Sequence, residues 1–398
     1  MIIELDLIQT FAAAMVVLFV GYFVNGRVSF LKRYSIPEPV VGGMIFALIV
    51  TVLQSQWGIQ FKMDMTLKKP LMLAFFTTVG LGARLSLLKV GGPKVLIFLF
   101  LTTILVAMQN VLGMTVAYLT DAHPLVGLLA GSITMVGGHG TGATFAGTFG
   151  GSHNLQAAME LAMAAATFGL VCGGLIGGPV AKRLIEKYRL ESTAEDGIGQ
   201  LDVEENNEVD LTPNLLLETM LVVAVPMALG QLLYHWSLAQ GFSLPGFVWS
   251  LFIGIIILNV CDVTGVYEVK AKAVDTIGTV SLSLFLAMAL MSLRLWELVN
   301  LAGPLLAVLV AQLTLVMTFA YHITFRVMGG DFDAAVMAAG QCGFGMGATP
   351  TAVANMEAVV AQNGPAPVAF LVVPLVGAFF IDITNVFAIQ LSIYMVGG

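Results

Sequence analysis

A glycine-rich motif occurs twice in this chain, once in each half, and both copies lie in very apolar surroundings. GGHGTGAT at 137–144 and CGFGMGAT at 342–349 share the pattern GxGxGAT. Glycine at every second position disfavours a stable transmembrane helix. Non-helical backbone at membrane depth is tolerated only where it is buried in protein or lines a water-filled cavity. Two such segments in matching halves are typical of the binding site of a secondary transporter.

The composition places the chain in a membrane. Of its 398 residues, 58% are hydrophobic and only 10% are charged, whereas soluble proteins carry about 25% charged residues. A net charge of −7, without a basic patch, argues against nucleic acid as a partner. Cys172, Cys261 and Cys342 are far apart, so neither a disulfide nor a metal cluster is expected. We therefore expect a multi-pass protein in a lipid bilayer.

Apolar runs of sufficient length predict ten spanning helices and two glycine-rich hairpins. The predicted spans are 7–24, 36–54, 70–88, 94–119, 155–181, 214–235, 244–260, 276–293, 303–325 and 366–394. The hairpins are predicted at about 124–150 and 332–358. The fold class expected is an all-α polytopic membrane protein.

The chain divides into two repeats joined by an acidic linker. IPEPVVGGMIFALIV at 36–50 aligns with LPGFVWSLFIGIIIL at 244–258, so the repetition extends beyond the glycine motifs. We predict an N-terminal repeat over 1–189 and a C-terminal repeat over 214–398. The segment between them, 190–213, is rich in Asp and Glu and has no Lys or Arg, which is typical of a solvated linker.

An odd number of spans in each repeat makes the second repeat inverted relative to the first. With both termini periplasmic, 13 of the 17 basic residues fall on the cytoplasmic side; the other four are Lys62, Lys68, Lys69 and Arg294. This distribution follows the positive-inside rule and puts the linker in the cytoplasm. The sequence thus predicts two inverted-topology repeats of five helices, each with one re-entrant hairpin.

The hairpins supply the candidate substrate-binding residues. Glycine lets a solute approach main-chain N–H groups closely, and a broken helix presents its N-terminal dipole to an anion. Hydroxyl, imidazole and amide side chains of the same segments add polar contacts. The alternative is that these small residues only let helices pack closely. The candidates are Ser132, Thr134, Gly137, Gly138, His139, Gly140, Thr141, Gly142, Thr144, Gly343, Gly345, Gly347, Thr349, Thr351 and Asn355.

Asp382 is the main candidate for binding a co-transported cation. A carboxylate within an apolar span is costly and indicates a functional site by default. Thr384 and Asn385 beside it could supply further oxygen ligands to Na⁺, and Glu160 after the first hairpin is a further candidate. The alternative for Asp382 is a structural hydrogen bond to a neighbouring helix. The sequence has no P-loop, HExxH motif or nucleophile elbow, so neither ATP hydrolysis nor enzyme activity is expected.

Seven long strings make the sequence resemble the bacterial sodium/glutamate symporter family. They are FLKRYSIPEPVVGG (30–43), DMTLKKPLMLAFFTTVGLGA (64–83), LLAGSITMVGGHGTGAT (128–144), ATFGLVCGGLIGGPVA (166–181), VSLSLFLAMALMSLRLWEL (280–298), AAGQCGFGMGATPTAVANM (338–356) and FLVVPLVGAFFIDITN (370–385). The resemblance implies Na⁺-coupled uptake of L-glutamate across the bacterial inner membrane. It also implies a homodimer, in which a transport unit that carries both hairpins moves as an elevator.

We therefore predict a Na⁺:L-glutamate symporter that works by alternating access. No cofactor is expected, because Na⁺ is a co-transported ion. One alternative is a Na⁺- or H⁺-coupled transporter of another carboxylate such as citrate. A less favoured alternative is a channel, because selectivity filters usually repeat one loop around a pore, whereas these two hairpins are predicted to enter from opposite sides.

Overall fold

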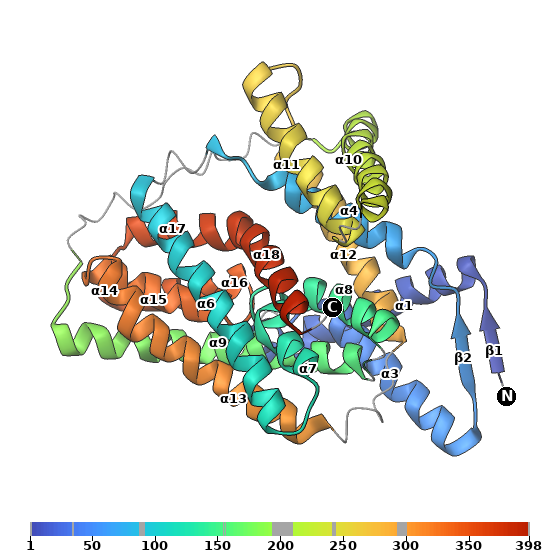
Figure 1. Ribbon diagram of the computed structural model, residues 1–398, viewed down its shortest axis with the longest axis horizontal. Coiled ribbons are helices and arrows are strands. Elements are labelled where there is room, and N and C mark those ends of the chain that lie inside the picture. Colours follow the sequence, from blue (N-terminus) through green and yellow to red (C-terminus); the bar gives the residue numbers. More distant parts are fainter. Residues whose placement is uncertain are drawn as a thin grey trace. The chain divides into compact units, whose positions relative to one another are not determined.

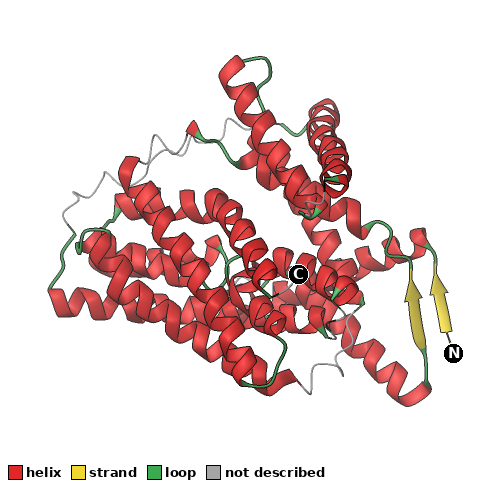
Figure 2. Ribbon diagram, viewed as in Figure 1, coloured by secondary structure: helices red, strands yellow, loops and turns green. Residues whose placement is uncertain are grey.

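The computed structural model describes residues 2–33, 36–86, 92–153, 155, 157–192, 210–240, 244–292 and 301–396. These residues are mostly helical (Figures 1 and 2). Most of the predicted linker, and Arg294, lie outside the described residues.

Eight of the described helices are long and apolar enough to cross a membrane. They are α1 (Leu7–Arg27), α3 (Glu38–Trp57), α6 (Gly92–Leu119), α9 (Ala158–Tyr188), α10 (Pro213–Ala239), α11 (Gly246–Thr264), α12 (Ala271–Met291) and the run Ala302–Val327. That run consists of α13 (Ala302–Phe319), the π-helix η3 (Ala320–Thr324) and α14 (Phe325–Val327).

The other two predicted spans form shorter or interrupted helices. The predicted span at 70–88 becomes α4 (Lys68–Gly82), which has only 15 residues. The predicted span at 366–394 becomes α17 (Pro367–Leu375), the π-helix η4 (Val376–Phe380) and α18 (Ile381–Met395). Pro374 is the penultimate residue of α17, and the π-helix begins two residues later at Val376; proline removes a backbone donor from the helical ladder. Ten spans remain a prediction, of which eight meet the length criterion among the described residues.

The all-α prediction misses a small parallel sheet. Strand β1 (Ile2–Leu5) pairs with β2 (Gln60–Met63), with Glu4 opposite Lys62. The two side chains form an exposed ion pair at 2.8 Å. Both strands are only four residues long, too short for their alternating pattern to stand out beside long apolar helices.

The chain forms two compact units, and each draws on both halves of the sequence. Unit 1 comprises Met1–Arg27, Pro37–Lys89 and Glu204–Leu293, and unit 2 comprises Val28–Ile36, Val90–Val203 and Arg294–Gly398. Unit 1 therefore holds both strands, α1, α3, α4, α10, α11 and α12.

Close backbone contacts hold unit 1 together. A Cβ atom on Gly21 of α1 would lie 2.0 Å from the Glu38 carbonyl oxygen of α3, and one on Gly80 of α4 would lie 2.2 Å from the Leu251 oxygen of α11. Helix α4 of the first half packs against α11 of the second, and in the same way α12 of the second half packs against α3 of the first. Likewise, α10 of the second half contacts α4, and α1 of the first half contacts α12. This exchange of partners is what two repeats related by a two-fold axis would give, and the inverted repeat stays a prediction.

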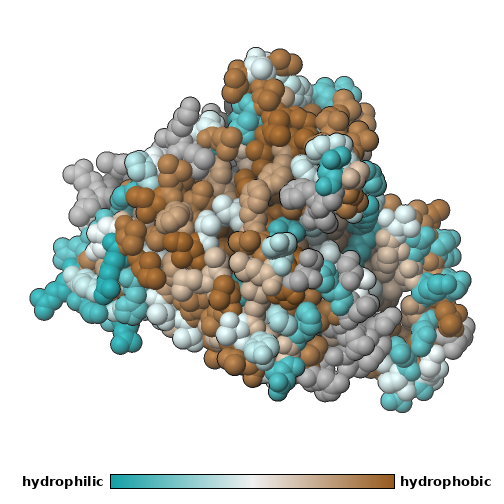
Figure 3. Space-filling view, viewed as in Figure 1, coloured by the Kyte–Doolittle hydropathy of each residue, from teal (hydrophilic) through white to brown (hydrophobic). Residues whose placement is uncertain are grey.

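Large apolar side chains point outward from unit 1. Helix α10 exposes Leu217, Leu221, Leu232 and Trp236 by more than half of their surface, and brown, apolar residues gather over α10 and α11 in Figure 3. An exposed apolar face of this kind is suited to lipid.

Unit 2 contains the two glycine motifs and the helices around them. Besides α6, α9, α13 and the C-terminal run, it holds α2 (Ser29–Arg33) and two interrupted segments. The first segment consists of α7 (Pro124–Leu128), the π-helix η1 (Leu129–Ile133) and α8 (Gly138–Ser152), and the second of α15 (Phe332–Phe344) and α16 (Thr349–Asn363). Helix α9 contacts α8, α15 and α16, whereas α6 contacts α7, η1, α13 and α18.

Candidate functional site

The first glycine segment is broken at two places. Gly131, inside η1, has φ −91° and ψ −141°, which is not helical. Gly138 has φ +60° at the start of α8, a conformation that glycine adopts without the steric cost of a Cβ atom. The expectation of non-helical backbone throughout 137–144 is wrong, because Gly140, Thr141, Gly142 and Thr144 already belong to α8. The break lies instead over Gly131 to Gly138.

The second glycine segment breaks within the motif itself. Helix α15 ends at Phe344, Ala348 is extended, and α16 starts at Thr349 with proline in its first turn. Gly345 and Gly347 thus lie in the break, whereas Gly343 is the penultimate residue of α15. Helices α15 and α16 have 13 and 15 residues, fewer than the roughly 20 that cross a bilayer. Two helices too short to cross the bilayer agree with a re-entrant hairpin at this place, and the hairpin stays a prediction.

The two breaks meet inside unit 2. A Cβ atom on Gly138 would lie 3.4 Å from the carbonyl oxygen of Gly347. Helix α9 packs directly on the second break, because a Cβ atom on its Gly169 would lie 2.0 Å from the Met346 oxygen. Asn355 of α16 donates a 2.9 Å hydrogen bond to the Gly173 oxygen of α9. Two motifs far apart in sequence therefore share one buried region.

Several of the predicted substrate ligands already have local partners. Thr134 donates to the Leu129 oxygen at 2.7 Å, and Thr144 donates to the Gly140 oxygen at 3.0 Å. His139 Nε2 lies 3.1 Å from Thr167 Oγ1 of α9. Asn355 also donates to the Ala339 oxygen at 3.3 Å, so its amide group ties α16 to both α9 and α15. These side chains fix the shape of the breaks through their contacts.

Two other candidate hydroxyls are buried and have no hydrogen-bond partner among the described residues. They are Ser132 Oγ next to the first break and Thr351 Oγ1 in the first turn of α16. Thr349 lies at the start of α16, and a Cβ atom on Gly377 would lie 3.2 Å from its hydroxyl oxygen. Gly137 precedes α8 and would place a Cβ atom 2.5 Å from the Thr141 Cβ atom, so a larger residue is excluded there.

Of the cation candidates on α18, Asn385 contacts the first break. Asn385 donates from Nδ2 to the Ser132 carbonyl oxygen at 3.2 Å, and Asp382 lies one helical turn earlier on the same helix. Thr384 donates to the Ile381 oxygen at 3.1 Å. Glu160 is buried in the first turn of α9. No cluster of three or more His, Cys, Asp or Glu side chains is found among the described residues, and Na⁺ can be bound by neutral oxygens instead.

Comparison with known proteins assigns the family. Residues 3–365 match the family model described as sodium/glutamate symporter. The Escherichia coli sodium/glutamate symporter is 48% identical over 399 residues, covering 98% of both chains. The Haemophilus influenzae sodium/glutamate symporter is 45% identical over 392 residues, covering 98% of this chain and 97% of that one. This chain belongs to the sodium/glutamate symporter family.

The likeness to solved structures is weak by comparison. The sodium/proton antiporter MjNhaP1 from Methanocaldococcus jannaschii is 13% identical, covers 98% of the symporter chain and gives a TM-score of 0.43. That value is too low to carry an argument about this symporter.

Sequence analysis missed two residues of the site, Gln109 and Asn110 in the middle of α6. Gln109 Nε2 donates to the Gly345 oxygen of the second break at 2.8 Å. Asn110 Oδ1 accepts from the Ser132 N–H of the first break at 3.0 Å. Gln312 of α13 donates to the Gln109 main-chain oxygen at 2.7 Å. The available signal was a pair of adjacent amides inside an apolar span, which is a functional indication of the same kind as Asp382.

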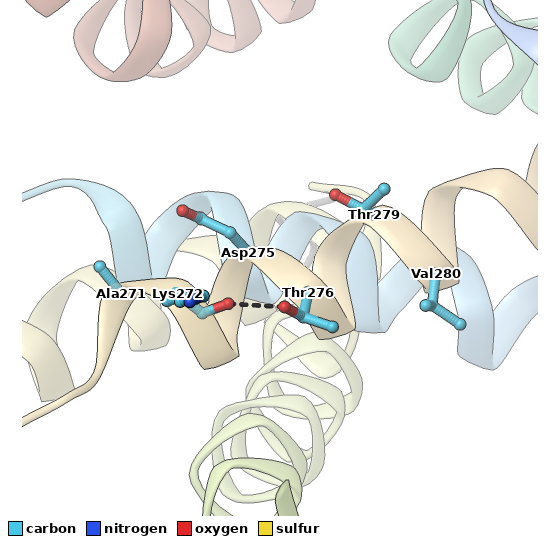
Figure 4. A pocket seen from close by; sticks show the side chains of 6 residues that line it. All are labelled: Ala271, Lys272, Asp275, Thr276, Thr279 and Val280. Carbon is cyan, nitrogen blue, oxygen red and sulfur yellow. Dashed lines mark hydrogen bonds between the residues drawn. The ribbon is translucent and has the colours of Figure 1, made fainter. Parts of the chain in front are cut away.

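An open cavity of about 440 Å³ lies in unit 1, and none of the candidate site residues named above lines it. Ala271, Lys272, Asp275, Thr276, Thr279 and Val280 of α12 line it (Figure 4). Thr276 donates to the Lys272 main-chain oxygen at 2.7 Å, as the dashed line marks. The cavity shows that one face of α12 is polar, and it contains none of the predicted ligands.

Proposed function

We propose that the chain carries L-glutamate into the cell together with Na⁺. The observation that carries this proposal is the meeting of two broken glycine segments in one unit of a chain of the sodium/glutamate symporter family. The breaks supply main-chain N–H groups for carboxylates and main-chain oxygens for a cation. The glycine-lined breaks are the proposed glutamate site, and Asp382 with Asn385 forms the proposed cation site.

Transport proceeds by alternating access. Unit 2 holds both breaks and the α18 candidates, so it is the part that we expect to carry substrate. The proposed movement is elevator-like, within a homodimer in the lipid of the inner membrane. Both termini are placed in the periplasm and the acidic linker in the cytoplasm, on the distribution of basic residues.

Uptake of labelled L-glutamate into proteoliposomes tests the proposal. With an inward Na⁺ gradient, glutamate should accumulate, and an inside-negative potential should increase the rate. Choline in place of Na⁺ should abolish accumulation. Accumulation that is indifferent to Na⁺ would contradict the coupling, and competition by excess citrate would favour the alternative carboxylate substrate. A flux that does not saturate with glutamate would favour a channel.

Substitution of Asp382 tests the proposed cation site. Asp382→Asn removes the charge of a half-buried carboxylate that we expect to attract Na⁺, so glutamate uptake should fall at least about tenfold and its Na⁺ dependence should weaken. Asp121→Asn is the matched control, because Asp121 is an exposed loop residue of the same unit with φ +57°, and asparagine tolerates that conformation. Unchanged Na⁺ dependence in Asp382→Asn would remove Asp382 from the site.

A further inference from the structure

Ser132 is held by two asparagines from different helices. Asn110 of α6 accepts from its main-chain N–H at 3.0 Å, and Asn385 of α18 donates to its main-chain oxygen at 3.2 Å. The neighbouring Gly131 is not helical, and the Ser132 main-chain oxygen also accepts from the N–H groups of Val136 and Gly137, each at 3.1 Å. These two long-range amide contacts help to fix the position of the Ser132 main chain.

These contacts also fix which way each amide points. Asn385 donates through Nδ2 to a carbonyl oxygen, so its Oδ1 atom must face away from the Ser132 backbone. Asn110 accepts the Ser132 N–H through Oδ1. If the amide were turned over, its Nδ2 donor would face the Ser132 N–H donor, so the amide cannot be turned over. The orientation of both amides therefore follows from the hydrogen bonds to Ser132.

Two oxygen atoms at this place are left buried without partners. Within the described part of the chain, Ser132 Oγ and Asn385 Oδ1 form no hydrogen bond, and the two residues are 0% and 1% exposed. Buried polar atoms in native proteins normally have a partner, so each exception calls for an explanation such as an ion. Asp382 lies one turn before Asn385 on α18.

We infer that Ser132 Oγ and Asn385 Oδ1 are direct ligands of a sodium ion at the first break, with Asn110 as a positioning residue. Hydroxyl and amide oxygens are hard ligands suited to such an ion, and the Asp382 carboxylate offsets its charge. The inference rests on the proposed function and deepens it. It assigns Ser132 to the ion rather than to glutamate, and adds Asn110 to the site.

Ser132→Ala separates a ligand from a structural hydroxyl. The variant keeps the backbone that both asparagines hold and removes only an oxygen that has no protein partner. Loss of an unpaired buried hydroxyl should leave stability without Na⁺ unchanged or slightly higher. Loss of an ion ligand should raise the Na⁺ concentration for half-maximal glutamate uptake about tenfold or more. It should also weaken the thermal stabilisation that Na⁺ gives the purified protein.

Two further variants complete the design. Ser132→Cys keeps the side-chain volume but offers a soft sulfur atom, so it should show the same loss as Ser132→Ala. Thr102→Val on α6 is the control, because Thr102 is equally buried and its hydroxyl already donates to the Phe98 oxygen at 2.8 Å. It should retain the Na⁺ dependence of the unaltered protein.

The outcomes separate this inference from the function on which it rests. If the unaltered protein shows no Na⁺-dependent uptake, the proposed function fails. If it does, while both Ser132 variants keep the same Na⁺ dependence, Ser132 binds only a structural water and the inference is overturned. A raised glutamate KM at saturating Na⁺, with no change in Na⁺ affinity, would instead return Ser132 to the glutamate site and equally overturn it.

Discussion

Gly138 and Gly347 set how closely the two breaks approach each other. The first has a left-handed backbone, and the second presents its carbonyl oxygen 3.4 Å from where a Gly138 Cβ atom would be. At Gly138 the space for a methyl group is adequate, so the cost of a larger residue comes from backbone strain. The conformation, rather than the packing, requires glycine here.

Gly138→Ala should destabilise unit 2 and reduce uptake. Left-handed backbone costs a non-glycine residue about 1–2 kcal/mol, and relief of that strain would move the break away from Gly347. Gly147→Ala is the matched control on the same helix, because no atom lies within 4 Å of its Cβ position. It should be neutral or stabilise by about 0.5–1 kcal/mol. Thermal unfolding and uptake would be measured together, and equal stability of both variants would contradict the assigned backbone.

Helix α9 is the element on which the second break packs. Its Gly169 faces the Met346 oxygen, and Gly173 faces the Gly343 oxygen at 3.1 Å from a Cβ position. Sequence analysis offered an alternative in which small residues only let helices pack closely. That explanation applies to α9, because its glycines let the backbone of α9 approach the second break. It applies to the second motif as well, because a Cβ atom on Gly343 would lie 2.5 Å from Ala352 and one on Gly347 would lie 2.8 Å from Leu170.

Gly169→Ala should displace the second break. Its Cβ atom would meet a main-chain oxygen at 2.0 Å, which cannot be relieved by turning a side chain, and overpacking of this kind costs about 1–3 kcal/mol. Gly178→Ala on the same helix meets nothing within 4 Å and should be tolerated. A loss of glutamate affinity with Gly169→Ala alone is the expected result in equilibrium binding. Equal affinities would show that α9 does not position the site.

Local pattern predicted where the interrupted segments lie but not what joins them. The predicted hairpins at 124–150 and 332–358 agree closely with α7 to α8 and α15 to α16, because glycine spacing reports on the backbone nearby. The contact of Gln109 with Gly345 joins residues far apart in sequence, and no local pattern encodes it. The start of α8 at Gly138 was also missed, since surrounding contacts stabilise a glycine-rich helix that its intrinsic propensity disfavours.

At the scale of the whole molecule, neither compact unit corresponds to one half of the chain. Unit 1 takes α1, α3 and α4 from the first half and α10, α11 and α12 from the second, and unit 2 is composed in the same way. A repeat in the sequence is therefore not a folding unit by itself. Each half would expose the surfaces that the other half covers.

Splitting the chain within the predicted linker tests this interdependence. Fragments 1–200 and 201–398, expressed separately, should fail to accumulate as folded protein, because each lacks half of both units. The same fragments expressed together should restore Na⁺-dependent glutamate uptake. Stable accumulation of either fragment alone, measured by its thermal unfolding after purification, would show that a repeat folds independently.

Gln109 and Asn110 are consecutive residues, and each holds a different break. A ligand that binds at one break and shifts its backbone therefore displaces α6, and α6 in turn displaces the other break. Energetic linkage of this kind is reciprocal: the factor by which Na⁺ raises affinity for glutamate equals the factor by which glutamate raises affinity for Na⁺. With the proposed cation and glutamate sites at these breaks, a dipeptide that joins them would give the carrier a physical means to avoid moving one cargo without the other, and so to prevent dissipation of the ion gradient by slippage.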